Sequence, residues 1–113
     1  MAKVEIALPL FKEIQKKFKG EAHNIIDLME SLEKNPQKCK LLGQVGGIVI
    51  KELRYKSFRF YFITDGYKLK LVSESGLIEA LLRFVRMSDK KDQQKTINEI
   101  RKILTILGPE GFK

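Results

Sequence analysis

The chain has 113 residues, which is the usual size of a single domain, so we expect one domain over residues 1–113. Apolar side chains make up 43% of the sequence, which is enough to close one core and excludes general disorder despite 32% charged residues. The 22 Lys and Arg exceed the 14 Asp and Glu and give a formal net charge of +8, which attracts polyanions. Nucleic acid is the leading polyanion and a membrane surface the second, although a basic composition can also serve solubility alone.

Cysteine usage and hydropathy bear on where the protein works. Cys39 is the single cysteine of the sequence, so an intramolecular disulfide and a cysteine metal cluster are excluded, and a reducing, cytoplasmic setting is expected. The first residues contain no apolar run of signal-peptide length, and no stretch approaches the ~20 apolar residues that span a bilayer. The sequence therefore predicts neither secretion nor a membrane partner, and it predicts no metal site.

The N-terminal third predicts a strand followed by two helices. Val4 to Leu8 alternates between apolar and polar residues and then meets a proline, which favours the first turn of a helix. From Leu10 to Lys19 apolar residues recur at helical spacing with lysines between them, and Gly20 is placed to end this basic amphipathic helix. A second apolar stripe begins at Ala22 and runs until Asn35-Pro36 stops it, which predicts a helix antiparallel to the first.

The middle of the chain predicts a run of strands. Leu41 to Gly47 is a glycine-rich segment, after which Ile48 to Tyr55 is rich in β-branched and aromatic residues and predicts a strand. A second strand is expected from Phe58 to Thr64. It ends in Asp65-Gly66, a dipeptide that supplies the positive φ angles of a tight hairpin turn, so Tyr67 to Val72 is expected to run back as a strand.

The C-terminal part predicts one more strand and a helix. Ser73 to Gly76 predicts a second turn, and the apolar run Leu77 to Met87 predicts a strand, although its beginning is also compatible with a helical turn. Ser88 is placed to cap a last helix, whose apolar stripe ends at Gly108-Pro109. The element order predicts an α+β fold, with two N-terminal helices and a C-terminal helix packed against one face of an antiparallel sheet of four to five strands.

Alternation along the Phe58 to Thr64 strand separates two sets of side chains. A period of two places its three phenylalanines on one face, which suits the core, and Arg59 and Tyr61 on the other. The preceding strand ends in Arg54 and Lys56, so cationic and phenolic groups can converge on one side of the hairpin, where a phosphate would fit. An alternative interpretation is that Arg59 and Tyr61 form the solvated face of a half-exposed sheet.

Further cations surround the junction between the last strand and the last helix. These are Arg83, Arg86, Lys90 and Lys91, and we expect some of them to face the same groove. Cations at a helix N-terminus oppose the helix dipole at about 0.3–1 kcal/mol each, so the two lysines indicate a use there. An exposed, charge-rich helix start is the alternative.

Short motifs in this order resemble a known family. Glu52-Leu53-Arg54, then Phe58 to Phe62 with Asp65-Gly66, then Phe84-Val85-Arg86 before a lysine-rich helix start are similar to the RelE/HigB toxins of toxin–antitoxin systems, in the RelE/ParE superfamily. The resemblance spans most of the chain. It implies two N-terminal helices packed on an antiparallel sheet, with a basic cleft facing outward. The segment from Gly66 to Phe84 is longer than usual in the family and is a candidate for an extra hairpin.

The resemblance implies a metal-free endoribonuclease that uses no cofactor and cuts mRNA on the ribosome. In this reaction the 2′-hydroxyl attacks the adjacent phosphate while basic side chains stabilise the developing charge. The implied partners are mRNA, the ribosome and an antitoxin protein that silences the toxin. The oligomeric state is not implied.

The matching positions give each residue an implied role. Arg59 matches the arginine that stabilises the transition state, and Arg86 matches a basic position near the end of the last strand. The general base stays unassigned, because Glu52 stands on a strand that carries lysines in RelE, and no tyrosine follows Tyr67. A lysine could serve as the base only if its pKa of about 10.4 were lowered. The catalytic candidates are Arg59, Arg86 and Lys90, and the nucleic-acid-binding candidates are Arg54, Lys56, Tyr61, Arg83 and Lys91.

The departures from the family pattern leave other functions open. One is a non-catalytic protein on the same fold, which binds RNA or inhibits a protein such as gyrase. The other is a basic DNA-associated protein that resembles these toxins in fold alone.

Overall fold

The computed structural model describes residues 1–72 and 78–112, which contain a five-stranded sheet and four α-helices. The elements in chain order are β1 (Ala2–Ile6), α1 (Leu8–Phe18), α2 (Ala22–Glu30), β2 (Lys40–Val45), β3 (Ile48–Tyr55), β4 (Phe58–Asp65), α3 (Gly66–Val72), β5 (Ala80–Asp89) and α4 (Gln93–Leu107). Short 3-10 turns follow α1, α2 and α4 at Lys19–Glu21, Ser31–Glu33 and Pro109–Phe112. The α+β class and the number of strands are confirmed.

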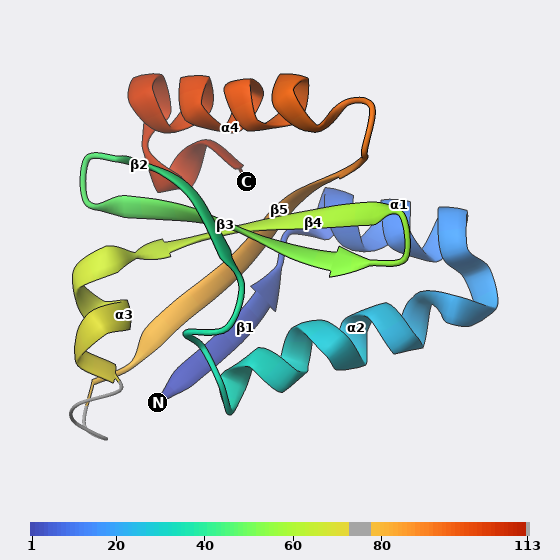
Figure 1. Ribbon diagram of the computed structural model, residues 1–113, viewed down its shortest axis with the longest axis horizontal. Coiled ribbons are helices and arrows are strands. Elements are labelled where there is room, and N and C mark those ends of the chain that lie inside the picture. Colours follow the sequence, from blue (N-terminus) through green and yellow to red (C-terminus); the bar gives the residue numbers. More distant parts are fainter. Residues whose placement is uncertain (73–77, 113) are drawn as a thin grey trace.

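The sheet differs from the expected one in its pairing and in its cover. Its strand order is β1-β5-β4-β3-β2, and β1 runs parallel to β5 while the other neighbours are antiparallel. A wholly antiparallel sheet was therefore the wrong expectation at β1. Helices also cover both faces and not one, because α4 packs on the side opposite α1 and α2 (Figure 1).

The face under α1 and α2 holds the larger part of the core. Phe60 and Phe62 of β4 are fully buried there and Phe58 packs at the margin, so the predicted phenylalanine face is confirmed. Leu10 and Ile14 of α1 face these rings at the helical spacing that the sequence predicts. The buried members of this core are Ala2, Leu10, Ile14, Ala22, Ile25, Met29, Leu32, Leu53, Phe60, Phe62, Leu69, Leu82 and Phe84.

The other face is closed by α4. Its predicted apolar stripe is confirmed, with Ile97, Ile100 and Leu104 buried against the sheet. Helix α4 ends at Gly108, whose φ of 71° is the left-handed conformation that favours glycine at this position. The buried members of this second core are Ile50, Tyr61, Ile63, Val85, Ile97, Ile100, Leu104 and Phe112.

The Asp65-Gly66 dipeptide begins a helix, so the expected hairpin turn and the returning strand over Tyr67 to Val72 were wrong. Asp65 Oδ1 accepts a hydrogen bond of 3.0 Å from the backbone N–H of Lys68, as a helix-capping side chain does. Gly66 N–H donates to the carbonyl of Gly47 at 2.9 Å. The segment therefore folds as α3, and the longer stretch after Gly66 supplies a helix where an extra hairpin was a candidate.

The hairpin that contains β4 is made with β3, and its turn is Lys56-Ser57. Lys56 adopts a φ of 55°, which few residues other than Gly, Asn and Asp tolerate well. The glycine-rich segment also differs from expectation, because most of it forms β2 and only Gly46 and Gly47 make the turn into β3.

The last strand ends, and the last helix begins, a few residues later in the chain than predicted. The Leu77 to Met87 segment is a strand from Ala80 to Asp89, and Ser88 lies inside it, so the expected helix cap at Ser88 was wrong. Asp92 occupies the N-cap position, directly before the first residue of α4, instead. The predicted turn at residues 73–76 and the start of that strand at residue 77 lie outside the described residues. None of the described helices has the length and apolar character needed to cross a membrane.

Candidate nucleic-acid interface

Three neighbouring strands bring arginines to the face of the sheet that α4 covers. In the β3–β4–β5 register Arg54 lies opposite Arg59, and Arg59 lies opposite Ser88. One step along the strands, at the next position on this face, Tyr61 lies opposite Arg86. Directly opposed residues of antiparallel strands project from the same face. We call Arg54, Arg59 and Arg86 the arginine cluster.

Glu52 is the carboxylate at the centre of this arrangement. Its side chain is 2% exposed, and it lies opposite Tyr61 on β4. Its Oε1 is 3.6 Å from Arg59 Nε, and its Oε2 is 3.8 Å from Arg54 Nε. Gln93, in the first turn of α4, donates a hydrogen bond of 2.9 Å from Nε2 to Oε1. One buried carboxylate thus faces two guanidinium groups and is tied to α4.

Arg59 is enclosed, which contradicts the expectation that it lies in an open groove. Only 5% of the residue is exposed; α4 packs on this face of the sheet, and Gln93 in its first turn is bonded to the neighbouring Glu52. Its Nη1 donates to the carbonyl of Ser57 at 3.2 Å, while its Nε has no hydrogen-bond partner among the described residues. The guanidinium is paired with Glu52 instead of facing solvent, so a phosphate has no direct access to it here.

Tyr61 is also buried, so it offers neither a phenol nor a ring face to RNA in this structure. Its hydroxyl is 2.7 Å from Ser88 Oγ, and Ser88 Oγ donates to the carbonyl of Asp89 at 2.9 Å. Burial raises the pKa of the Tyr61 phenol, and the bond to Ser88 partly opposes that rise. For Arg59 and Tyr61, both interpretations, an open phosphate groove and a solvated surface, are wrong, because the packing of α4 on this face leaves these two residues buried.

Arg86 and Arg83 lie on β5 but in different surroundings. Arg86 Nε donates to Glu99 Oε1 of α4 at 2.7 Å, and its guanidinium stands 5.2 Å above the Phe112 ring. Arg83 Nε is 3.0 Å from Glu5 Oε1 of β1. Arg83 lies opposite Ile63, four residues beyond Arg59 on β4, which is about 13 Å along a strand. It is therefore separate from the arginine cluster.

The remaining predicted cations lie at the surface near the β3–β4 turn. Arg54 has 61% of its side chain exposed, and Lys90 and Lys91 are exposed in the loop before α4. Lys56, in the turn itself, is paired with Glu21 from the turn after α1. These residues share one end of the sheet, because Phe58 at the start of β4 lies opposite Asp89 at the end of β5.

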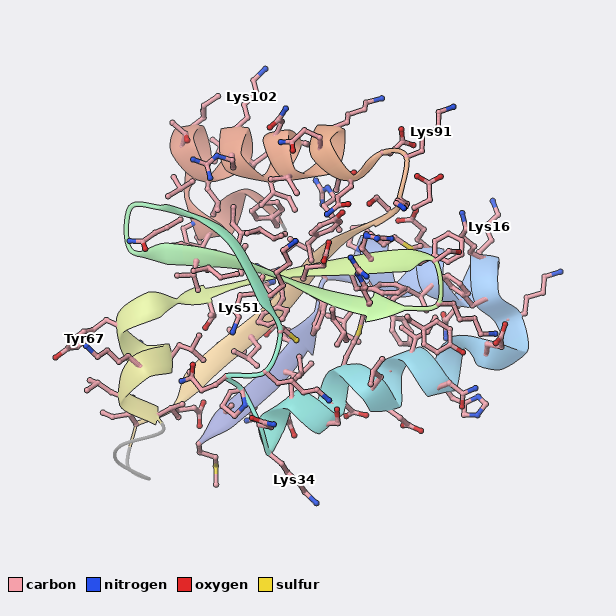
Figure 2. The ribbon with its side chains drawn as sticks, viewed as in Figure 1. Lys16, Lys34, Lys51, Tyr67, Lys91 and Lys102 are labelled. Carbon is pink, nitrogen blue, oxygen red and sulfur yellow. The ribbon has the colours of Figure 1, made fainter. Side chains whose placement is uncertain are left out.

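Lysines of the first helix extend this surface and were not among the predicted site residues. Lys17 Nζ lies 4.8 Å above the Phe58 ring, which joins the end of α1 to the start of β4. Lys16 and Lys91 project outward at the same end of the molecule, away from Lys34 and Lys102 (Figure 2). The feature of the sequence that could have indicated these residues is the lysine-rich outer side of α1. We call the combined surface the basic end: Lys16, Lys17, Lys19, Arg54, Lys56, Lys90 and Lys91.

Acidic groups are also present at this surface, and we consider whether they could hold a metal ion. Glu21, Asp89 and Asp92 lie among the cations of the basic end. The described residues contain no cluster of three His, Cys, Asp or Glu side chains that could hold a metal ion. The geometry offers a set of exposed cations beside one buried guanidinium, that of Arg59, which is already paired with Glu52.

Comparison of the chain with protein-family models, with curated proteins and with solved structures finds no match.

Proposed function

We propose that this protein is an RNA-directed toxin of the RelE/HigB type, which binds mRNA at the basic end and cleaves it there. The observation that carries the proposal is the placement of Arg54, Arg59 and Arg86 on one face of three adjacent strands, next to exposed lysines. The motif resemblance adds the class of substrate. An antitoxin protein that covers the same cations would silence it.

Binding relies on the exposed members of the basic end. Arg54 offers a planar fork that matches two phosphate oxygens, while Lys90 and Lys91 offer compact charges. Single-stranded RNA suits this end because its phosphates can follow an irregular surface of cations. The predicted RNA contacts of Arg54 and Lys91 are compatible with their exposure. Lys90, which the sequence predicts as a catalytic residue, is exposed beside Lys91 and is proposed here to bind RNA as well.

Cleavage requires an exchange of partners at Arg59. The 2′-hydroxyl oxygen attacks the adjacent phosphorus and loses its proton, while the 5′-oxygen of the next nucleotide leaves and takes up a proton. The products are a 2′,3′-cyclic phosphate and a 5′-hydroxyl. For Arg59 to stabilise the transition state, the phosphate has to replace Glu52 beside it, and the Gln93 contact has to open.

The second candidate is a non-catalytic RNA-binding protein on the same fold. The burial of Arg59 and Tyr61 favours it, because a structural role for both residues needs no movement of α4. The two candidates share the basic end and differ at the arginine cluster.

The deciding experiment measures binding and cleavage separately. The protein is mixed with end-labelled single-stranded RNA and with mRNA on ribosomes, and 5′ ends are mapped. The variant Lys90→Gln/Lys91→Gln is expected to weaken binding, whereas Lys34→Gln/Lys102→Gln removes the same charge away from the basic end and should not (Figure 2). Arg59→Lys is expected to abolish cleavage and preserve binding.

Each outcome assigns the function. Specific cleavage with 2′,3′-cyclic phosphate ends supports the toxin, and binding without cleavage supports the second candidate. Growth arrest with intact mRNA would transfer the proposal to a protein target. If neither pair of lysine variants alters RNA binding, or if no binding occurs, the RNA-directed function is refuted.

A further inference from the structure

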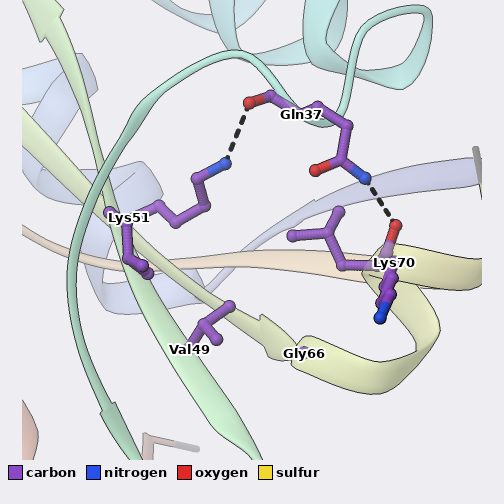
Figure 3. A pocket seen from close by; sticks show the side chains of 7 residues that line it. Gln37, Val49, Lys51, Gly66 and Lys70 are labelled. Atoms are coloured by element: carbon purple, nitrogen blue, oxygen red, sulfur yellow. Dashed lines mark hydrogen bonds between the residues drawn. The ribbon is translucent and has the colours of Figure 1, made fainter.

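Lys51 is a buried lysine on the face of the sheet opposite the arginine cluster. It precedes Glu52 on β3 and lies opposite Phe62, so it projects toward the side that holds α1, α2 and α3. Only 5% of the residue is exposed. Figure 3 shows its ammonium group reaching toward Gln37, which lies in the segment between α2 and β2.

The hydrogen bonding of Lys51 is incomplete. Its Nζ donates one hydrogen bond of 3.1 Å, to the carbonyl of Gln37, although an ammonium group has three donors. No salt bridge to Lys51 is found among the described residues. A buried ammonium without a counter-ion is unfavourable, and burial lowers the pKa of Lys51 accordingly. The unpaired position beside Nζ is therefore suited to an anion.

Lys51 lines a cavity large enough for such an anion. The cavity has a volume of about 330 Å³, at the small end of the range for small-molecule sites. Its walls combine aliphatic residues with a glutamine and two lysines. The lining residues are Gln37, Leu41, Val49, Lys51, Gly66, Leu69 and Lys70.

Two contacts hold the walls of this cavity in place. Gln37 Nε2 donates a hydrogen bond of 2.6 Å to the carbonyl of Leu69, which ties the segment before β2 to α3 (Figure 3). A Cβ at Gly66 would lie 3.0 Å from Val49 Cγ1 and 3.3 Å from the carbonyl of Gly47. A side chain there would press on β3, so glycine lets α3 start close to the strand. The walls of the cavity are therefore joined by a hydrogen bond and by the close approach of α3 to β3.

We propose that this cavity binds a small carboxylate with an aliphatic body, its head group on Lys51 Nζ and its body against Leu41, Val49 and Leu69. One buried ammonium suits a singly charged head. The aliphatic walls suit a body of a few carbons, given the volume. Lys70 also lines the cavity, on the α3 side. Because this site lies across the sheet from the arginine cluster, it does not depend on the RNA-directed function.

The test compares two probes of equal length, hexanoate and 1-hexanol, by NMR titration of the intact protein. Saturable shifts of the Val49 and Leu69 methyl signals are expected with hexanoate at millimolar concentrations, with binding of 1-hexanol about tenfold weaker. Inorganic phosphate is expected to compete weakly, because it has no aliphatic body. Equal affinities for hexanoate and 1-hexanol, or no saturable shift with hexanoate, would overturn the proposal.

Variants locate the site. Lys51→Met keeps the aliphatic stem and removes the charge, and it is expected to weaken hexanoate binding about tenfold or more. Lys102→Gln removes an exposed lysine of α4, on the other side of the sheet, and should leave the affinity unchanged. The amide spectrum of each variant reports whether it is folded. Full hexanoate binding by folded Lys51→Met would refute the role of Lys51, and RNA binding should stay unchanged in that variant.

Discussion

Glu52 and Gln93 are joined by a hydrogen bond of 2.9 Å between Gln93 Nε2 and Glu52 Oε1, and this bond connects β3 to the first turn of α4. The same carboxylate faces Arg54 and Arg59. The single negative charge of Glu52 is therefore shared between two guanidinium groups, while its bond to Gln93 holds α4 beside them.

The first prediction concerns this carboxylate. Glu52→Gln keeps the shape of the side chain but leaves Arg59 buried without a counter-ion, so the free energy of unfolding is expected to fall by about 3 kcal/mol. Glu99→Gln is the matched control, because it removes a carboxylate from a partly exposed pair with Arg86, and its effect is expected within about 0.5 kcal/mol. Urea denaturation measures both. Equal losses would show that Glu52 has no special role in the buried cluster.

The second prediction concerns Tyr61. It separates a structural role of the buried phenol from the predicted role in binding RNA. Tyr61→Phe removes the hydrogen bond between its hydroxyl and Ser88 and keeps the ring, so the free energy of unfolding is expected to fall by about 1 kcal/mol. RNA affinity is expected to stay unchanged, because the ring is buried under α4. A loss of RNA affinity without a loss of stability would show that the phenol reaches the nucleic acid.

The third prediction concerns Lys51 and pH. Burial lowers the pKa of Lys51 from its ordinary value of 10.5. Between the lowered pKa and 10.5 the unfolded chain holds more protons than the folded one, so the contribution of Lys51 to the free energy of unfolding rises with pH. Below that window the buried charge is a constant penalty.

Lys51→Met removes this penalty, and the free energy of unfolding at pH 7 is expected to rise by about 1 kcal/mol. The difference between the two proteins should shrink as pH rises through the window, as followed by urea denaturation at several pH values. Cys39, which interacts electrostatically with Lys51, and Lys70, which lines the same cavity, are present in both proteins. A destabilised Lys51→Met at pH 7 would contradict the assignment of Lys51 as an unfavourably buried charge.

The fourth prediction concerns the turn between β3 and β4. Lys56 has a φ of 55°, a conformation that Asn adopts readily and a β-branched residue does not. Lys56→Asn is expected to keep the melting temperature within about 2 °C, whereas Lys56→Val is expected to lower it by about 5 °C or more. Equal melting temperatures for the two variants would mean that the turn relaxes to another conformation.

The sequence predicted the phenylalanine face of β4 because strand alternation is a local property. The large apolar rings of Phe60 and Phe62 are fully buried on that face. It did not predict that the Arg59 and Tyr61 face is also buried. That depends on α4, which follows more than thirty residues later and covers this face with its own apolar stripe. A period of two marks both faces of a strand but does not show which elements will cover each one.

The errors in topology have the same origin. Asp65-Gly66 suits both a tight turn and a helix start, and the bonds that select the helix come from Lys68 and from Gly47 of the neighbouring turn. The parallel pairing of β1 with β5 joins residues almost eighty positions apart, such as Ala2 and Ala80. Local patterns carry no information on such a partner. The α1 lysines were visible as a basic helix, but their place beside Phe58 was not.

The last prediction tests whether RNA contacts the basic end or only senses the net charge. If Lys90 and Lys91 each neutralise one phosphate of single-stranded RNA, each contact contributes about 0.7 to the slope of log K against log salt concentration. Lys90→Gln/Lys91→Gln is therefore expected to reduce the magnitude of the slope by about 1.4. Lys34→Gln/Lys102→Gln lowers the net charge equally and should leave the slope unchanged, because these lysines lie away from the basic end. Equal reductions in the two double variants would mean that RNA responds to the net charge of the protein. The proposal that the basic end is the RNA-binding site would then be refuted.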